Sequence, residues 1–348
     1  MSDTALITGG AGFVGTNMAD RLLRAGQRVT VLDDLSRPGV ERNLRWLQKA
    51  HGDRLRVELG DVRDAELVRR AVVGATQVFH FAAQVAVTTS VTDPLHDFDV
   101  NLRGTITVLE ELRRLTEPPP LLFTSTNKVY GDLADVAIRK RNNRYEPVDE
   151  AMSRTGIGEA RGLHFCSPYG CSKGGADQYV LDYAKSFGLS TVVFRMSCIY
   201  GPHQQGNEDQ GWVAHFAKEA LAGNPITLYG DGRQVRDVLY VDDLVDAMLL
   251  AVDQTHLLSG QAFNMGGGPG STVSLLELVD RISDACGRRP TVHFDDWRVG
   301  DQRWYVSDTR RFRQATGWST RVGVAEGVDR LLAWLRAGDR ELSVAEVG

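Results

Sequence analysis

A tyrosine and a lysine four positions apart, Tyr169 and Lys173, offer the most definite chemistry in this sequence. Positions i and i+4 of a helix share one face, so the Lys173 ammonium can lie close to the Tyr169 phenol and stabilise its ionised form. A phenol ordinarily titrates near ~10, and a neighbouring cation makes it a usable base near neutral pH. The spacing is common by chance, so it predicts a catalytic pair only where other site residues accompany it.

Hydroxyl side chains at the end of an apolar run supply a second part of this site. Thr124, Ser125 and Thr126 follow the run that starts at Leu121. Ligands of doubly wound sheets bind beyond the carboxyl ends of the strands, so we expect Thr126 to hydrogen-bond a substrate hydroxyl that Tyr169 deprotonates. The alternative is that these hydroxyls only cap the next turn, but the other motifs meet at the same sheet edge and favour the catalytic interpretation.

A glycine-rich segment, residues 9–15 (GGAGFVG), lies between the first predicted strand and the first predicted helix. Glycine permits a tight turn and a close approach of the backbone to a pyrophosphate, which the N–H groups at the helix N-terminus can bind. Asp33 ends the second strand and suits the 2'-hydroxyl of an adenosine ribose, whereas it would repel a 2'-phosphate. The segment therefore predicts NAD as the cofactor in preference to NADP, although Arg37, close by, would suit NADP.

A scaffold of strands and helices must bring these residues to one edge. Short apolar runs, mostly without polar alternation, predict strands buried on both faces at residues 4–8, 29–32, 55–59, 78–81, 121–124 and 191–195. Amphipathic stretches between them predict helices that include residues 13–25, 101–114 and 169–187. This alternation predicts an α/β fold with a doubly wound parallel sheet (Rossmann) and a smaller C-terminal α/β lobe.

The length of 348 residues allows about two domains. We expect residues 1–200 to form the dinucleotide-binding domain, with part of 233–265 returning to it, and residues 201–348 to form mostly a substrate-binding domain. Residues 132–165 are polar and longer than most loops of compact domains, which predicts a functional loop. The basic cluster at 139–144 within it is expected to be solvated, in preference to binding an anion.

Composition and cysteine usage exclude several classes of protein. A net charge of -5 disfavours nucleic acid and anionic membranes as partners. No run reaches the ~18 apolar residues of a membrane span, and a strand at 4–8 leaves no room for a signal peptide. The four cysteines lack C-x-x-C spacing, which predicts reduced thiols and a cytoplasmic location. No metal is expected, because no cluster has ligand spacing, and His80 and Trp212 are expected in the core.

Together these motifs resemble the extended short-chain dehydrogenase/reductases over nearly the whole chain. The residues that carry the resemblance are Gly9-x-x-Gly12-x-x-Gly15, Asp33, Asp61, Phe81-Ala82-Ala83, Thr126 and Tyr169-x-x-x-Lys173. Longer strings resemble a subgroup, the CDP-tyvelose (CDP-paratose) 2-epimerases, at residues 125–133, 167–173, 176–179, 209–213 and 233–239. The insertion at 132–165 also fits that subgroup.

The resemblance implies an isomerase of carbohydrate biosynthesis that inverts C2 of a nucleotide-linked hexose with NAD. Tyr169, with Thr126 and Lys173, would take the hydroxyl proton as hydride passes to the nicotinamide, and hydride would return to the other face of the keto sugar. Implied cofactor contacts are Gly9, Gly12, Phe13, Val14, Gly15, Asp33, Ser36, Arg37, Asp61, Val62, Phe81, Ala82, Gln84, Asn101, Thr124, Tyr169, Lys173 and Ile199. Implied substrate contacts are Thr126, Ser197, Gln210, Arg236 and Arg303, and the two arginines suit a diphosphate. A homo-oligomer, either a dimer or a tetramer, is also implied.

Two departures from the related enzymes bear on the reaction. Nucleotide-sugar 4,6-dehydratases carry an Asp-Glu pair after the catalytic threonine, whereas Asn127 and Lys128 stand here, which disfavours elimination. The tyvelose epimerases have histidine before Ser-Pro-Tyr, whereas this chain has Cys166, with His164 two positions earlier. The sugar can therefore differ from CDP-tyvelose. A nucleotide-sugar 4-epimerase and a non-catalytic NAD-binding scaffold stay open as alternatives.

Overall fold

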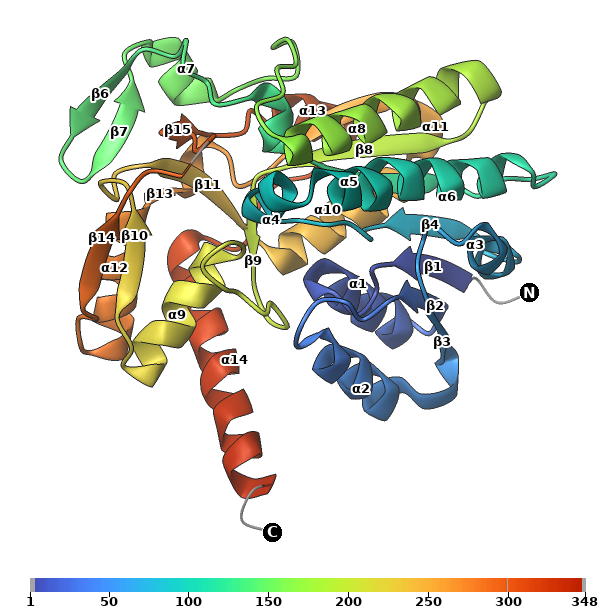
Figure 1. Ribbon diagram of the computed structural model, residues 1–348, viewed down its shortest axis with the longest axis horizontal. Helices are drawn as coiled ribbons and strands as arrows, with labels where there is room; N and C mark the ends of the chain where they lie inside the picture. The colour runs from blue at the N-terminus through green and yellow to red at the C-terminus, as the bar shows by residue number, and fades with distance from the viewer. Residues whose placement is uncertain (1–3, 299, 346–348) are drawn as a thin grey trace.

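A seven-stranded parallel sheet forms the centre of the computed structural model, which describes residues 4–298 and 300–345 (Figure 1). The strand order is β12-β8-β5-β4-β1-β2-β3. The strands are β1 (Thr4–Thr8), β2 (Arg28–Asp33), β3 (Leu55–Leu59), β4 (Gln77–His80), β5 (Leu121–Thr126), β8 (Thr191–Met196) and β12 (Gln261–Met265). Helices cover both faces, so the predicted doubly wound α/β fold is confirmed.

Successive side chains of each inner strand point to opposite faces, and both faces are apolar. In β1, Ala5 and Ile7 face one core and Leu6 faces the other. The first core lies under α1 (Phe13–Arg24), α2 (Val40–His51) and α10 (Val241–Asp253), and the second lies under α3 (Ala65–Val72), α6 (Gly104–Arg113) and α8 (Pro168–Phe187). Figure 1 shows α1 and α2 on the opposite side of the sheet from α6 and α8.

Some predicted boundaries and burial patterns need correction. β3 is the edge strand and Leu59 is 62% exposed, so the expectation of a strand buried on both faces is wrong there. β4 ends at His80, one residue early. The helix predicted over 101–114 begins as a π-helical turn, η2 (Asp99–Arg103), which continues into α6. His80 is fully buried, as expected.

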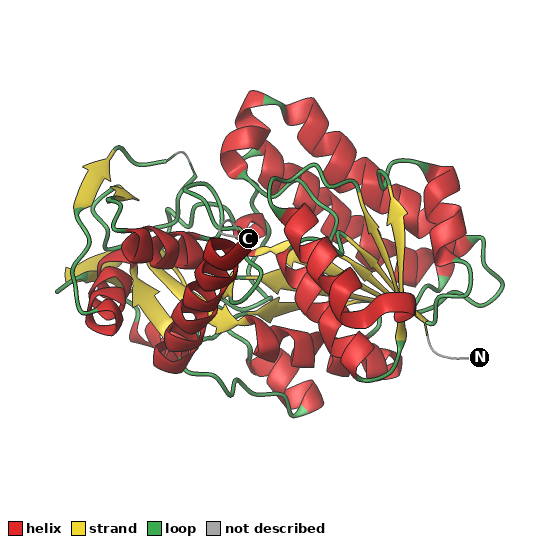
Figure 2. Cartoon of the chain, turned by 90° about the horizontal axis from the view of Figure 1, so that it is seen from below, coloured by secondary structure: helices red, strands yellow, loops and turns green. Residues whose placement is uncertain are grey.

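The second lobe lies beside the main sheet (Figure 2). Its strands are β9 (Cys198–Tyr200), β10 (Ile226–Tyr229), β11 (Val235–Tyr240), β13 (Thr272–Ser274), β14 (Val292–Asp295) and β15 (Trp304–Tyr305). Its core lies among α9 (Trp212–Ala222), α12 (Leu275–Cys286) and α14 (Val324–Ala345). Trp212 packs against that core as predicted, and its Nε1 donates to Cys198 Sγ over 3.3 Å.

The 132–165 segment is not the loop that its polarity predicted. It folds into a hairpin of β6 (Ile138–Arg141) and β7 (Arg144–Pro147), followed by α7 (Glu150–Thr155). The hairpin packs on the second lobe, where the Arg144 guanidinium donates to both Glu277 oxygens over 2.9 and 2.8 Å. Other basic residues of the cluster pair with Glu146 and Asp231. Arg144 and Lys140 therefore link the insertion to the second lobe, whereas Arg139 and Arg141 pair with Glu146 within the hairpin. The side chains of Arg139, Lys140 and Arg141 are exposed to solvent, as expected.

Shorter elements complete the described chain. They are η1 (Gly52–Arg54), α4 (Val87–Thr92), α5 (Pro94–Phe98), η3 (Asn127–Tyr130), α11 (Thr255–Leu258), η4 (Pro269–Ser271) and α13 (Arg310–Thr316). Across residues 4–298 and 300–345, no helix has both the length and the apolar character that a membrane span requires.

Candidate active site

A cavity of about 480 Å³ opens beyond the carboxyl ends of the central strands. Most of the predicted cofactor residues line it, which is where ligands of doubly wound sheets bind. Those residues are Gly9, Gly12, Phe13, Val14, Gly15, Asp33, Ser36, Arg37, Asp61, Val62, Phe81, Ala82, Gln84, Thr124, Tyr169 and Lys173. Asn101 and Ile199 do not line it, whereas Gln210, predicted for the substrate, does.

The glycine turn leaves a cradle that side chains would fill. Gly9 has a φ of +67°, and a Cβ there would lie 2.6 Å from the backbone nitrogen of Ala82. A Cβ on Gly15 would lie 2.3 Å from the Gly9 carbonyl oxygen. Gly12 is the N-cap residue of α1 and provides no side-chain cap, so the first N–H groups of α1 are available to an anion. These features fit the pyrophosphate of a dinucleotide.

Asp33 is held at the cavity by two backbone donors. Its two carboxylate oxygens each accept a hydrogen bond over 2.9 Å, from the N–H groups of Ala11 and Leu35. Burial raises the pKa of Asp33, and these hydrogen bonds oppose that rise. Across the cavity, Arg37 donates to the Gln210 side-chain oxygen over 2.5 Å. The carboxylate faces the ligand space while the arginine is already paired, an arrangement that fits NAD.

The start of α8 positions the catalytic pair. Ser167 caps this helix by accepting from the Gly170 N–H over 3.0 Å, and Pro168 suits the first turn. Tyr169 therefore sits in the first turn and Lys173 one turn later. Both line the cavity, and Lys173 Nζ lies 4.2 Å from the centroid of the Phe123 ring.

Burial shifts the pKa values of both members of this pair. Burial raises the pKa of Tyr169 to about 12, while a side-chain hydrogen bond with Thr126 acts to lower it. Burial also lowers the pKa of Lys173 to about 7. Burial is therefore the largest influence on the pKa of both groups, and Thr126 is the neighbour that favours the ionised phenol.

A buried polar network behind the cavity was missing from the prediction. Asn101 Nδ2 donates to Asp97 Oδ1 over 3.0 Å and to Ser172 Oγ over 3.1 Å, and Ser172 Oγ donates to Asp97 Oδ2 over 2.5 Å. Asn101 Oδ1 also accepts from the Gln84 N–H over 2.9 Å. Asn101 therefore positions Gln84 from behind and does not itself line the cavity. The pairing spans distant segments, so no local pattern signals it.

Two further polar groups sit close to the catalytic residues. Ser125 lines the cavity, and its buried Oγ has no hydrogen-bond partner among the described residues, which leaves it available to a ligand. The sequence signal for it was its place between Thr124 and Thr126. His80 is different, because Thr8 and Thr105 contact its two ring nitrogens and burial lowers its pKa to about 3. His80 is a neutral core histidine.

Three of the five predicted substrate residues lie on the side of the second lobe, whereas Thr126 ends β5 and Gln210 lines the cofactor cavity. Arg236 is buried, and its Nη2 lies 2.6 Å from Asp301 Oδ1. Ser197 donates to the Asp237 side chain over 2.5 Å, so it is held within the lobe. Arg303 is exposed, with its guanidinium carbon 5.2 Å from the Trp297 ring centroid. These three residues stand outside the cofactor cavity.

Asn127 and Lys128 stand where the related dehydratases have their Asp-Glu pair. Both side chains bind the segment that follows β14. Asn127 Nδ2 donates to Gln302 Oε1 over 3.1 Å, and Lys128 Nζ donates to the Gly300 carbonyl over 3.2 Å. Burial lowers the pKa of Lys128, and Asp301 opposes that shift. The substrate side therefore carries a half-buried amine where elimination chemistry would need a carboxylic acid.

Arg298 is a candidate that the sequence interpretation did not include. Its Nη1 donates to the Glu208 carbonyl over 2.7 Å, and its Nη2 lies 3.3 Å from Asp209. Its guanidinium carbon lies 3.7 Å from the Tyr229 ring centroid. Since Asp209 lines the cofactor cavity, Arg298 reaches the rim of that cavity.

Comparisons with known proteins agree with this arrangement. The family model "NAD dependent epimerase/dehydratase family" matches residues 5–266. A CDP-paratose 2-epimerase of Salmonella typhi is 40% identical over 336 residues, covering 94% of this chain and 98% of that protein.

Solved structures agree as well. A UDP-glucose 4-epimerase of Thermotoga maritima, solved with UDP-glucose, is 29% identical, covers 96% of this chain and 99% of its own, and has a TM-score of 0.82. A UDP-glucose 4-epimerase of Thermus thermophilus, solved with NAD, is 33% identical with the same coverage and a TM-score of 0.80. The predicted family resemblance, enzyme class and NAD cofactor are confirmed. The chain belongs to the NAD-dependent epimerase/dehydratase family.

Proposed function

We propose that this enzyme inverts C2 of a nucleotide-linked hexose of the CDP-paratose/CDP-tyvelose type. The observation that carries the proposal is the 40% identity to a CDP-paratose 2-epimerase across 94% of the chain. The strings that resemble this subgroup also meet in space. Residues 125–133 contact 300–302 through Lys128, and residues 233–239 contact them through Arg236.

In this proposal the chain supplies proton handling and a shielded site. Tyr169 takes the proton of the C2 hydroxyl, and Thr126, hydrogen-bonded to the phenol, favours its ionised form. NAD, when bound, supplies a positively charged nicotinamide ring that can take up and give back hydride. Ser125 offers a free buried hydroxyl at the same end of the cavity. Arg236 and Arg303 remain the arginines proposed for a diphosphate, and Arg298 at the rim is a third. Arg236 and Arg298 would exchange their present pairing with Asp301 and Asp209 for the phosphates.

Residue chemistry separates epimerisation from elimination. Expulsion of water from a sugar needs an acid to protonate the leaving hydroxyl. Asn127 and Lys128 supply an amide and an amine, and both are engaged with residues 300–302. This supports an epimerase over a dehydratase. A 4-epimerase is the second candidate, favoured by the likeness to the two solved UDP-glucose 4-epimerases.

The proposal also assigns each ligand to a part of the chain. Residues 1–200 with part of 233–265 hold NAD, and the rest of 201–348 holds the sugar nucleotide.

The chain forms a dimer or tetramer through the α5 and α8 side of the sheet. The exposure of Leu95 (76%), Phe187 (49%) and Tyr179 (45%) supports this assembly. Sedimentation velocity tests the assembly, and a monomer at micromolar concentration would contradict it.

A substrate panel tests the reaction. The purified enzyme with NAD is incubated separately with CDP-paratose, CDP-tyvelose and UDP-glucose, and the products are followed by proton NMR. We expect the two CDP sugars to interconvert and UDP-glucose to remain unchanged. Formation of UDP-galactose without change of the CDP sugars would replace the proposal with the 4-epimerase, and no product from any sugar would favour a non-catalytic NAD-binding protein.

A further inference from the structure

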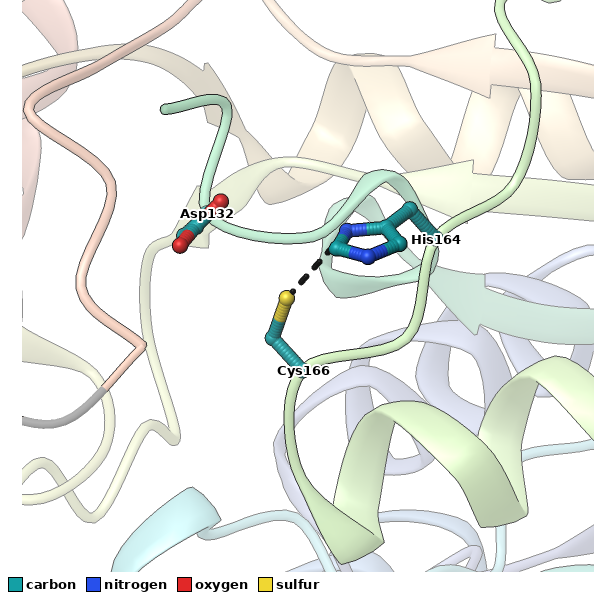
Figure 3. A group of neighbouring side chains, drawn as sticks. All are labelled: Asp132, His164 and Cys166. Carbon is teal, nitrogen blue, oxygen red and sulfur yellow. Dashed lines mark hydrogen bonds between the residues drawn. The ribbon is translucent and has the colours of Figure 1, made fainter. Parts of the chain in front are cut away.

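Three side chains of types that bind metals meet at the neck of the 132–165 insertion (Figure 3). Asp132 stands where the chain leaves the body of the protein, and His164 and Cys166 stand where it returns. Cys166 Sγ lies 3.4 Å from His164 Nδ1, and one donor atom from each of the three residues lies within 4.8 Å of the others. Residues far apart in sequence thus form a cluster that ligand spacing along the chain could not reveal.

The distance between sulfur and nitrogen suits a tetrahedral ion. With Zn–S near ~2.3 Å and Zn–N near ~2.05 Å, tetrahedral geometry puts the two ligand atoms about 3.6 Å apart. The observed 3.4 Å is close to that separation. One Asp132 oxygen accepts from the Ala134 N–H over 3.1 Å, so the other oxygen can turn toward an ion. Solvent reaches the Asp132 side chain.

The backbone holds His164 in place and leaves space beside His164 and Cys166. The His164 N–H donates to the Val129 carbonyl over 2.9 Å, which fixes the returning strand against η3. Gly131 crosses directly beside the pair with a φ of +75°. A Cβ there would lie 2.7 Å from His164 Nδ1 and 3.1 Å from Cys166 Sγ. Glycine therefore keeps open the space next to both donor atoms.

We propose that Asp132, His164 and Cys166 bind a zinc ion through three protein ligands, with water in the fourth position. A thiolate and an imidazole select a borderline or soft ion over magnesium or calcium, which prefer oxygen ligands. Binding releases the Cys166 thiol proton to solvent, and the zinc is neither oxidised nor reduced. The ion closes the neck of the insertion and anchors the segment that leads into α8, one residue before Ser167.

Cobalt titration of the full-length enzyme with NAD tests the site, because cobalt reports tetrahedral thiolate ligation by its absorption. We expect a thiolate-to-cobalt charge-transfer band that saturates at one ion per chain and is displaced by zinc. Cys166→Ser and His164→Ala should weaken binding by about 100-fold or more, and Asp132→Asn by at least about 10-fold, since even outer partners of metal ligands are worth about 10–100-fold. Cys286→Ser, in the second lobe, is the matched control and should bind as the wild type does.

Two measurements keep this test decisive. Far-UV circular dichroism and NAD binding establish that each variant is folded, and the exposed His164 side chain can be removed without disturbing the core. Zinc content after gel filtration gives a second readout, with one ion per wild-type chain and none in Cys166→Ser. Absence of the charge-transfer band in the wild type, or a band that survives Cys166→Ser and is lost in Cys286→Ser, would overturn the proposal. Equal zinc content in wild type and Cys166→Ser would do so too.

Discussion

Replacing Lys173 with methionine should remove a distinctive pH dependence from the stability of the ligand-free protein. Lys173 is 3% exposed, and burial lowers its pKa from an ordinary 10.5 to about 7. Between these two values the unfolded chain binds more protons at Lys173 than the folded protein does. The free energy of unfolding therefore rises with pH across this interval, and methionine, which has no proton to lose, abolishes the rise.

The size of the effect follows from the two pKa values. Linkage gives an unfavourable contribution of about 4 kcal/mol at pH ~7, which falls to about 1.5 kcal/mol at pH ~9.5. Wild type should therefore gain about 3 kcal/mol relative to Lys173→Met over this range. Lys128, whose pKa burial also lowers, contributes in the same direction in both proteins, so the comparison cancels it.

Urea unfolding at constant ionic strength, followed by tryptophan fluorescence at half-unit pH steps, measures the difference. Lys185→Met is the matched control, because Lys185 is exposed in the last turn of the same helix. This variant should track the wild-type pH dependence. Parallel curves for wild type and Lys173→Met from pH 7 to 9.5 would refute the reasoning, since they would mean that Lys173 stays charged in the folded protein.

Three further predictions concern catalysis, cofactor binding and stability. Tyr169→Phe should lower turnover by about 10²–10⁴-fold with NAD binding retained, because it removes only the proton acceptor, and unchanged turnover would contradict its role. Gly15→Ala should abolish NAD binding measured by calorimetry, because its Cβ would lie 2.3 Å from a carbonyl oxygen, whereas Gly162→Ala has open space and should bind normally. Asp177→Asn should destabilise the protein by about 3–5 kcal/mol in urea unfolding, because it leaves Arg195, buried and 2.8 Å from that carboxylate, without its counter-charge, and a loss below about 1 kcal/mol would contradict this.

The sheet could be predicted because its strands are apolar on both faces. The predicted strand at 55–59 matches β3 to the residue, and the one at 4–8 matches β1. The hairpin at 138–147 could not be predicted in the same way, because β6 and β7 are short and rich in charge. Their stability comes from partners in the second lobe, such as Glu277, that only the folded chain brings near.

The candidate site shows the same limit. The glycine turn and the Tyr169 to Lys173 spacing are local, so sequence could place them at the cavity. Asp97 meets Ser172 across 75 positions, and no local pattern records such a pair. Burial raises the pKa of Tyr169, and the spacing of Tyr169 and Lys173 along the chain carries no information about burial.

The fate of the hydrogen on C2 during the reaction tests the central proposal most directly. Epimerisation of a CDP-hexose in deuterated water, followed by proton NMR, reports whether the hydrogen on C2 leaves the active site. If Tyr169 handles only the hydroxyl proton and the carbon-bound hydrogen passes to NAD and back in a shielded site, the product keeps its C2 hydrogen. Deuterium at C2 of the product would contradict this account and indicate proton abstraction from carbon.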